Sequence, residues 1–287
     1  MVTRFAPSPT GDLHLGHAYS AAFAASLAQG TSDRFLVRIE DIDRGRCRDA
    51  FIRRNLEDLH WLGLRWQEPV LRQSTQMHRY KAALASLGSL GVTYFCFCTR
   101  KQIRDEIAAA ADAPQAGAKP SIYPGTCRKQ DPSESAARIA RGDPYAVRLA
   151  SQRAYELTGE LTWIEDGQCT QHLNLSTLGD VVIARKEMET SYHLAVVVDD
   201  AAQGVTHVTR GVDLFDATHV HRLLYALLGL NPPVWRHHPL CCDASGRRFA
   251  KRDKDLTIRV LRERGLSPAD VLALAEEATN LDGPRSC

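Results

Sequence analysis

The chain has 287 residues, of which 44% are hydrophobic and 24% are charged, a composition typical of a globular protein with one large or two modest domains. Its formal net charge of +2 gives little indication of a nucleic-acid partner. The sequence shows neither an apolar run of the roughly 20 residues that a membrane span needs nor a secretory signal. Its eight cysteines are too few for a disulfide scaffold. We therefore expect a cytoplasmic protein.

The first third of the chain is predicted to alternate strands and helices. Residues 2–7 and 35–40 indicate buried strands, an alanine-rich helix is predicted over 16–29, and a second helix over 49–62. Strand, loop, helix, strand and helix in this order are typical of a parallel, doubly wound sheet.

The rest of the chain is predicted to interrupt this sheet and then resume it. Residues 96–180 mix short helical and β-like pieces with Pro/Gly turns, which indicates an insertion. Strand-like segments at 181–184 and 205–208, with an apolar segment at 192–198 and a helix over 215–229, then continue the alternation. We therefore divide the chain into 1–95 and 181–240 as the halves of the sheet domain, 96–180 as the insertion, and 241–287 as a basic loop followed by helices over 257–264 and 268–278.

The stretch RFAPSPTGDLHLGH, residues 4–17, joins the first predicted strand to the first predicted helix. Ligands of open α/β sheets bind at the carboxyl ends of the strands, and a helix N-terminus suits phosphate. Gly16 permits a close approach to the backbone, and His14 and His17 can donate hydrogen bonds to phosphate oxygens. No G-x-G-x-x-G or P-loop motif is present, and no nearby set of cysteines and carboxylates completes a metal shell. ATP binding is favoured over a metal site or a structural loop.

Several motifs together resemble the glutamyl- and glutaminyl-tRNA synthetases of class I. Their HIGH motif stands here as His14-Leu15-Gly16-His17, and further matching blocks follow in the family's order: VRIEDIDRGR at 37–46, YHLAVVVDD at 192–200, GVTHVTRGVDL at 204–214 and RRFAKRD at 247–253. The resemblance covers about residues 2–255. It implies an α/β fold with a Rossmann-type doubly wound sheet, an α+β zinc-containing insertion and a short helical tail.

The resemblance also implies roles for individual residues. Catalysis falls to His14, His17 and Lys251, and ATP binding to the same three residues and Gly16. Lys251 takes the place of the lysine of the family's KMSKS-like loop, although the first lysine and the serine of that loop are absent. Glutamate binding falls to Arg4, Phe5, Ala6, Pro7, Ser8, Glu40, Tyr192 and Arg210.

Among these residues, Arg4 and Arg210 would supply two cationic contacts for a dicarboxylic substrate, and Glu40 would hold its α-ammonium group. From the sequence alone, Glu40 as a surface acid, Tyr192 as a core-edge aromatic and Arg210 as a surface ion pair stay open as alternatives. Lys251 as one cation of a basic stretch also stays open.

The cysteine spacing predicts a metal site within the insertion. Cys96 and Cys98 form a C-x-C pair, and Tyr123 precedes Cys127 in YPGTC. Three thiolates are three of the four ligands of a tetrahedral zinc, but the spacing alone leaves buried structural cysteines open. The resemblance implies a structural zinc with Tyr123 as fourth ligand. The adjacent pairs 237–238 (His-His) and 241–242 (Cys-Cys) are interpreted as structural or incidental, since neighbouring side chains in an extended segment point opposite ways.

Within the family, the chain is similar to a short paralogue that modifies tRNA. Too few residues follow Lys251 for an anticodon-binding domain, which needs roughly 50 residues or more, so no such domain is expected. The resemblance implies tRNA-independent activation of L-glutamate with Mg·ATP and transfer to the cyclopentenediol of queuosine, at the wobble position of the tRNA(Asp) anticodon stem-loop, by a monomer. The alternatives are a genuine glutamyl-tRNA synthetase that charges the tRNA 3′ end, or a non-catalytic zinc-containing RNA-binding protein.

Overall fold

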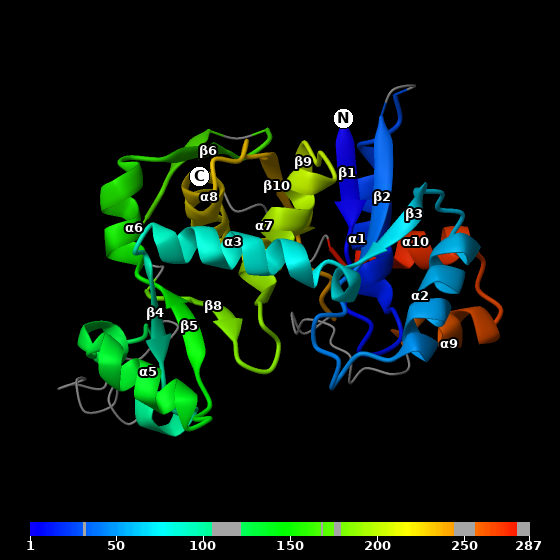
Figure 1. The fold of residues 1–287 in the computed structure, drawn as a ribbon. Coiled ribbons are helices and arrows are strands. Elements are labelled where there is room, and N and C mark those ends of the chain that lie inside the picture. The colour runs from blue at the N-terminus through cyan, green and yellow to red at the C-terminus, as the bar shows by residue number, and fades with distance from the viewer. Residues whose placement is uncertain (31–32, 105–121, 168, 175–178, 244–255, 280–287) are drawn as a thin grey trace.

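The computed structural model describes residues 1–30, 33–104, 122–167, 169–174, 179–243 and 256–279. Two regions are visible in Figure 1: parallel strands with helices packed around them, and a smaller antiparallel sheet at the far end of helix α3 (Met77–Ser89). The functional question is which side chains each region places together.

The parallel strands form a three-stranded and a two-stranded sheet that lie next to each other. Three of them pair in the order β1 (Val2–Phe5), β2 (Arg34–Ile39) and β3 (Gln67–Arg72). A second parallel pair consists of β9 (His207–Gly211) and β10 (Val234–His238). The backbone N–H of Thr206, just before β9, donates to the carbonyl of Val2 at 3.0 Å, and β9 lies beside β1 in Figure 1. The resulting order, β3-β2-β1-β9-β10, confirms the predicted α/β fold with parallel strands.

Of the five predicted helices, the four nearest the two ends of the chain are found close to their expected bounds. They are α1 (Leu15–Ser26), α2 (Asp49–Trp61), α9 (Ile258–Glu263) and α10 (Pro268–Glu277). The alanines of α1 are the reason that it packs closely: Ala18 and Ala21 are fully buried and share a core cluster with Val271 and Ala275 of α10. Small side chains let the two helix backbones approach each other, which fixes the start of α1 at the carboxyl end of β1.

The antiparallel sheet corrects one prediction. It contains β4 (Thr93–Cys96), β5 (Ala146–Leu149) and β8 (Val182–Arg185) in the order β4-β5-β8. Residues 181–184 are predicted to resume the parallel sheet, but they lie in or beside β8, which pairs with β5 instead. The antiparallel sheet therefore reaches beyond both predicted bounds of the insertion, residues 96 and 180. Strand propensity does not specify which strand a segment will pair with. Here the segment pairs with the edge of β5, where the N–H of Leu149 donates to the carbonyl of Val181.

The remaining elements connect these two sheets. The apolar segment at 192–198 forms the first part of helix α7 (Tyr192–Ala202), and α8 (Ala217–Leu227) matches the helix predicted over 215–229. The smaller elements are η1 (Gln73–Thr75), η2 (Thr126–Lys129), α5 (Pro132–Ala140), α6 (Ser151–Thr158), β6 (Thr162–Ile164), β7 (Thr170–His172) and η4 (Val212–Leu214). Within the described ranges, no helix has both the length and the apolar character needed to cross a membrane.

Candidate active site

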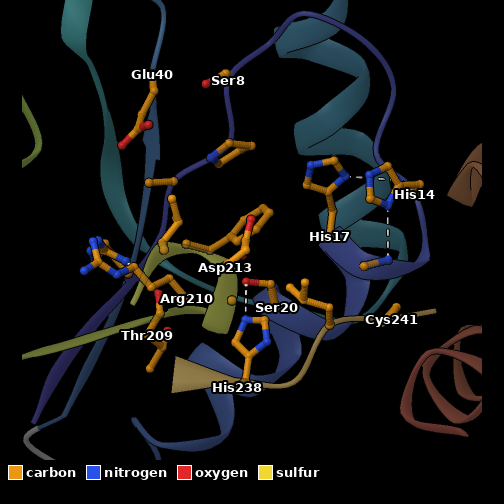
Figure 2. Close-up of a pocket in the computed structure, with 18 of the residues that line it drawn as sticks. Ser8, His14, His17, Ser20, Glu40, Thr209, Arg210, Asp213, His238 and Cys241 are labelled. Carbon is orange, nitrogen blue, oxygen red and sulfur yellow. Dashed lines mark hydrogen bonds between the residues drawn. The ribbon is translucent and has the colours of Figure 1, made fainter. Parts of the chain in front are cut away.

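A cleft of about 470 Å³ opens where β1, β9 and β10 end and α1 begins. This edge, the carboxyl end of the parallel strands, is where doubly wound sheets bind ligands. The cleft brings together eleven side chains or backbone positions that the sequence singled out: Arg4, Phe5, Ala6, Pro7, Ser8, His14, Gly16, His17, Glu40, Tyr192 and Arg210. Figure 2 shows ten of the lining residues labelled around it. Lys251, the expected triphosphate contact, lies outside the described residues.

His14 and His17 form the cap of α1. The N–H of Gly16 donates to Nδ1 of His14 at 3.1 Å, and the N–H of His14 donates to Nδ1 of His17 at 3.2 Å. Because Nδ1 of each ring accepts, the neutral imidazole carries its proton on Nε2, which is then a donor. Two oriented N–H donors therefore stand beside a helix N-terminus, where backbone N–H groups and the helix dipole attract an anion.

His238, at the end of β10, is a cleft residue that the sequence did not identify. Its Nδ1 donates to the carbonyl of Pro239 at 2.8 Å, and its Nε2 accepts from the hydroxyl of Ser20 at 3.0 Å, as Figure 2 shows. Its neighbour His237 bonds instead to Glu165 and Arg210. The two side chains have different hydrogen-bond partners, as expected of neighbours in an extended strand. These contacts agree with a structural interpretation of the pair, and His238 in addition lines the cleft.

Arg4 is held by a buried carboxylate. Its Nε and Nη2 donate to the two oxygens of Asp200 at 3.0 and 3.2 Å, and its Nη1 donates to the carbonyl of Thr209 at 3.0 Å. Asp200 also accepts from Nη1 of Arg38 at 2.6 Å. These bidentate contacts fix the guanidinium plane. The charge expected to meet the substrate is therefore already paired with Asp200, although Arg4 still lines the cleft.

Glu40 is buried, which rules out the surface-acid alternative. It is 9% exposed, and Nη2 of Arg38 lies 3.4 Å from its Oε1. Burial raises the pKa of Glu40, and the charges of Arg38 and Arg4 oppose that rise. Arg38 is itself fully buried and also faces Asp199 at 3.9 Å. Arg38 therefore fixes the position of the Glu40 carboxylate at the cleft. A carboxylate held in this way is a suitable partner for an ammonium group.

Arg210 differs from Arg4 in its partners. It is 5% exposed, and among the described residues no carboxylate lies within ion-pair distance of it. Its Nε, Nη1 and Nη2 donate to His237 at 3.0 Å, His221 at 2.9 Å and Thr218 at 2.5 Å. Burial lowers the pKa of Arg210, but arginine keeps its charge in proteins. A buried cation without an anionic partner attracts a substrate carboxylate, and the surface ion-pair alternative is ruled out.

Tyr192 is the first residue of α7, and it lines the cleft. Ser191 caps the helix by accepting from the N–H of Leu194 at 3.5 Å, and this cap brings the tyrosine to the cleft. Its phenol is a hydrogen-bond neighbour of Arg210. Burial raises the pKa of Tyr192, and Arg210 opposes the rise, so the phenol is a neutral hydrogen-bonding group beside the cation at neutral pH.

The predicted metal ligands also meet, in the antiparallel region. The sulfurs of Cys96, Cys98 and Cys127 all lie within 4.8 Å of one another, and the phenol oxygen of Tyr123 lies 3.4 Å from the sulfurs of Cys96 and Cys98. The sulfurs of Cys98 and Cys127 are 3.4 Å apart. The sulfurs of a tetrahedral zinc with Zn–S bonds of about 2.3 Å are about 3.8 Å apart. The donor set and its spacing therefore fit a small tetrahedral metal ion.

The surroundings of Tyr123 act in opposite directions on the proton of its phenol. Its Oη accepts from the backbone N–H of Cys127 at 2.9 Å, and the guanidinium carbon of Arg148 lies 3.8 Å from the centre of its ring. Tyr123 is 6% exposed. Burial and the neighbouring cysteines raise the pKa of Tyr123, and the N–H of Cys127 opposes the rise. A phenolate ligand would therefore form only with a metal cation beside it.

The charged residues beneath the cleft are those that sequence reasoning missed. Arg38 interrupts an apolar strand, and Asp199 and Asp200 follow an apolar helical segment. That pattern was a usable signal, because a charged residue inside an apolar run is buried only when it is paired. The identity of the partners was not accessible from the pattern, since 196 residues separate Arg4 from Asp200.

Comparison with known proteins places these features in a family context. The family described as tRNA synthetases class I (E and Q), catalytic domain, matches residues 1–275. A glutamyl-Q tRNA(Asp) synthetase from Rhodobacter capsulatus is 46% identical over 281 residues, which cover 96% of this chain and 99% of that protein. Another from Nocardia farcinica is 42% identical over 279 residues, covering 97% and 84%.

Solved structures agree on the fold. A glutamate tRNA ligase from Elizabethkingia meningosepticum, in complex with its amino acid, is 27% identical, with a TM-score of 0.73. The match covers 89% of this chain and 52% of the ligase, so the chain spans about half of that protein's length.

Proposed function

The chain belongs to the class I tRNA synthetase family of the glutamate and glutamine enzymes, and from that membership we propose that it activates L-glutamate with ATP without tRNA and transfers the glutamate to queuosine in tRNA(Asp). It is an ATP-dependent ligase of the aminoacyl-tRNA synthetase type. The observation that carries the choice of amino acid is Arg210, a buried cation in the cleft whose hydrogen-bond acceptors are neutral.

Glutamate fits the charges of the cleft. We assign its α-ammonium group to Glu40 and the carboxylate at its other end to Arg210 and Tyr192, while Arg4, fixed by Asp200, directs its remaining N–H groups toward the substrate. Phe5, Ala6, Pro7 and Ser8 form the adjoining wall. Glutamine lacks the second negative charge, and the buried Arg210 charge would then stay without an anionic partner.

The cap of α1 fits the ATP phosphates. An oxygen of the α-carboxylate attacks the α-phosphorus of Mg·ATP, the bond to pyrophosphate breaks, and glutamyl-adenylate and pyrophosphate form. The Nε2–H groups of His14 and His17 and the α1 N-terminus, close to Gly16, supply donors where phosphate charge develops. Lys251 remains the expected triphosphate cation. Positioning and charge stabilisation account for this step, without covalent catalysis by the protein.

We assign a structural zinc to Cys96, Cys98, Tyr123 and Cys127. The support is the spacing of their donor atoms and the N–H that Cys127 donates to the phenol oxygen. Bound there, the metal would tie the end of β4 to η2 and so hold the antiparallel region together.

The acceptor is proposed from the relatives. Proteins 46% and 42% identical to this chain, over nearly its whole length, carry the name glutamyl-Q tRNA(Asp) synthetase. On this basis the partner is the anticodon stem-loop of tRNA(Asp) and the receiving group is the cyclopentenediol of queuosine. A modified base in a single-stranded loop can be splayed out and read by its edges, which suits this kind of recognition.

Pyrophosphate exchange followed by glutamate transfer tests the proposal. We expect exchange with glutamate and ATP in the absence of tRNA, and transfer of labelled glutamate to queuosine-containing tRNA(Asp) but not to the same tRNA lacking queuosine. The label should also survive periodate oxidation of the 3′-terminal diol when the diol of queuosine is protected.

Each other outcome selects a different activity. Exchange that requires tRNA, with transfer to queuosine-free tRNA, would indicate a glutamyl-tRNA synthetase that charges the 3′ end. No exchange under either condition would leave a non-catalytic RNA-binding protein. Glutamine in place of glutamate is the matched substrate control.

A further inference from the structure

The hydrogen-bond acceptors around Arg210 differ in kind from those around Arg4 and Arg38, two other buried arginines. Arg4 and Arg38 both donate to Asp200, so a carboxylate balances each of them. Arg210 donates to the imidazoles of His221 and His237 and to the hydroxyl of Thr218, which together we call the Arg210 cage. All three acceptors are neutral when the histidines are unprotonated, so they fix the guanidinium without cancelling its charge.

The protonation state of His221 follows from its neighbours. Its Nδ1 lies 2.9 Å from Nη1 of Arg210, and since a guanidinium only donates, that nitrogen must accept. Its Nε2 therefore carries the proton and donates to Nδ1 of His193 at 3.1 Å. Burial and the charge of Arg210 lower the pKa of His221 well below its usual value. The imidazole is thus a neutral acceptor at physiological pH.

The second imidazole is fixed in the same way from the opposite side. Nε2 of His237 accepts from Nε of Arg210 at 3.0 Å, so its Nδ1 carries the proton and donates to Glu165 at 2.8 Å. The other oxygen of Glu165 accepts the backbone N–H of His237 at 2.7 Å. Glu165 is 1% exposed. The nearest carboxylate in this chain of hydrogen bonds therefore lies behind an imidazole and does not contact the guanidinium.

We propose that the Arg210 cage positions Arg210 while leaving its charge unbalanced, and that this makes the cleft select a substrate carboxylate over a carboxamide. The inference rests on the proposed function, since it takes Arg210 as the contact for the end of the amino acid. A carboxylate in the cage would hold the guanidinium equally well but would compete with the substrate for its charge. The neutral acceptors are therefore specificity-determining positioning residues.

Two variants of His221 separate positioning from charge. His221→Asn places an amide oxygen near the position of Nδ1, and His221→Asp places a charged oxygen of the same size there; both lose the bond to His193. We expect His221→Asp to raise KM for glutamate about tenfold or more and to narrow the preference for glutamate over glutamine by a similar factor. His221→Asn should raise KM about threefold at most and keep the preference. KM for ATP should change less than twofold in either variant.

Pyrophosphate exchange measures these constants, with thermal unfolding as the check on folding. Equal effects of the Asn and Asp variants, or an unchanged glutamate preference in His221→Asp, would overturn the inference while leaving the proposed function intact. If the Asp variant does not fold, Thr218→Val and Thr218→Ser replace it: the Val variant should raise KM for glutamate and the Ser variant should restore it. Absence of glutamate-dependent exchange by the unaltered protein, with or without tRNA, would overturn both proposals.

Discussion

At the scale of single residues, the cleft is built on charges that the fold pairs before any substrate arrives. Asp200 accepts from both Arg4 and Arg38, and it is 2% exposed. The two arginines outweigh the effect of burial, so the pKa of Asp200 lies below its usual value. The carboxylate therefore stays ionised and serves as the fixed point from which both guanidinium groups are oriented.

Replacing Asp200 by Asn should destabilise the protein strongly. The substitution keeps the shape but leaves two buried guanidinium groups without their shared anion, and breaking a buried ion pair costs about 3–5 kcal/mol. We expect the free energy of unfolding in urea at pH 7 to fall by that amount. Asp143→Asn is the matched control, because Asp143 pairs with Arg138 at a half-exposed position, where such a pair contributes at most about 1 kcal/mol. Equal losses in the two variants would contradict the role given to Asp200.

At the scale of elements, short-range sequence sets where the helices begin, and long-range packing sets what their inner faces meet. Ser267 and Asp270 form a capping box at the start of α10, as His14 and His17 do for α1. The inner face of α2 carries an acid, Asp58, which is 1% exposed, and its Oδ2 has no hydrogen-bond partner among the described residues. Burial raises its pKa to about 6, and Arg259 opposes the rise.

The raised pKa of Asp58 predicts how stability depends on pH. Because the folded pKa of about 6 exceeds the ordinary value of 3.8, the folded state binds the proton more tightly, and stability is lost as the pH rises from about 4 to about 6. Lowering the pH from 7 to 5 should therefore give the wild-type protein about 1 kcal/mol of stability that Asp58→Asn does not gain. Urea denaturation of both proteins at the two pH values measures the difference. Parallel changes in the two proteins would show that Asp58 does not titrate in this range.

At the scale of the whole molecule, the cleft and the cysteine cluster occupy separate regions. The cleft lies at the end of β1, β9 and β10, whereas the cluster lies beyond β4, at the other end of α3 in Figure 1. The two regions share α3 and α7, which pack together at the centre of the molecule. This separation predicts that a change at the cluster affects glutamate activation less than it affects the antiparallel region itself.

Loss of the proposed zinc should affect the antiparallel region more than glutamate activation in the cleft. We expect Cys127→Ser to reduce the metal content from the proposed one zinc per chain and to lower the unfolding temperature, because a metal bound there would tie β4 to η2. Transfer to tRNA should fall more than tRNA-independent pyrophosphate exchange. Cys169→Ser is the control, since Cys169 is exposed and outside the cluster, and it should keep one zinc. Equal zinc content in both variants by metal analysis would argue against the assigned ligands.

The sequence alone determined the features that depend on neighbours a few residues apart. Helical periodicity located α1, α2, α8, α9 and α10, and the C-x-C spacing singled out Cys96 and Cys98. Tyr123 as a candidate ligand came only from the family resemblance. The opening loop led to the cleft because a strand followed directly by a helix places the intervening residues at one edge of the sheet. In each case the structural outcome is contained in a short segment or in a spacing along it.

Tertiary structure alone decided the partners. It paired Arg4 with Asp200 inside the protein, so that this arginine is not left for a ligand alone. It also surrounded Arg210 with neutral acceptors and placed β8 beside β5 in the antiparallel sheet. The physical reason is the same for all three. A strand edge or a guanidinium accepts any suitable partner, and which partner arrives depends on segments far away in the chain. Residue types therefore indicated the chemistry of the cleft, and packing determined which of its charges remains unbalanced for the substrate.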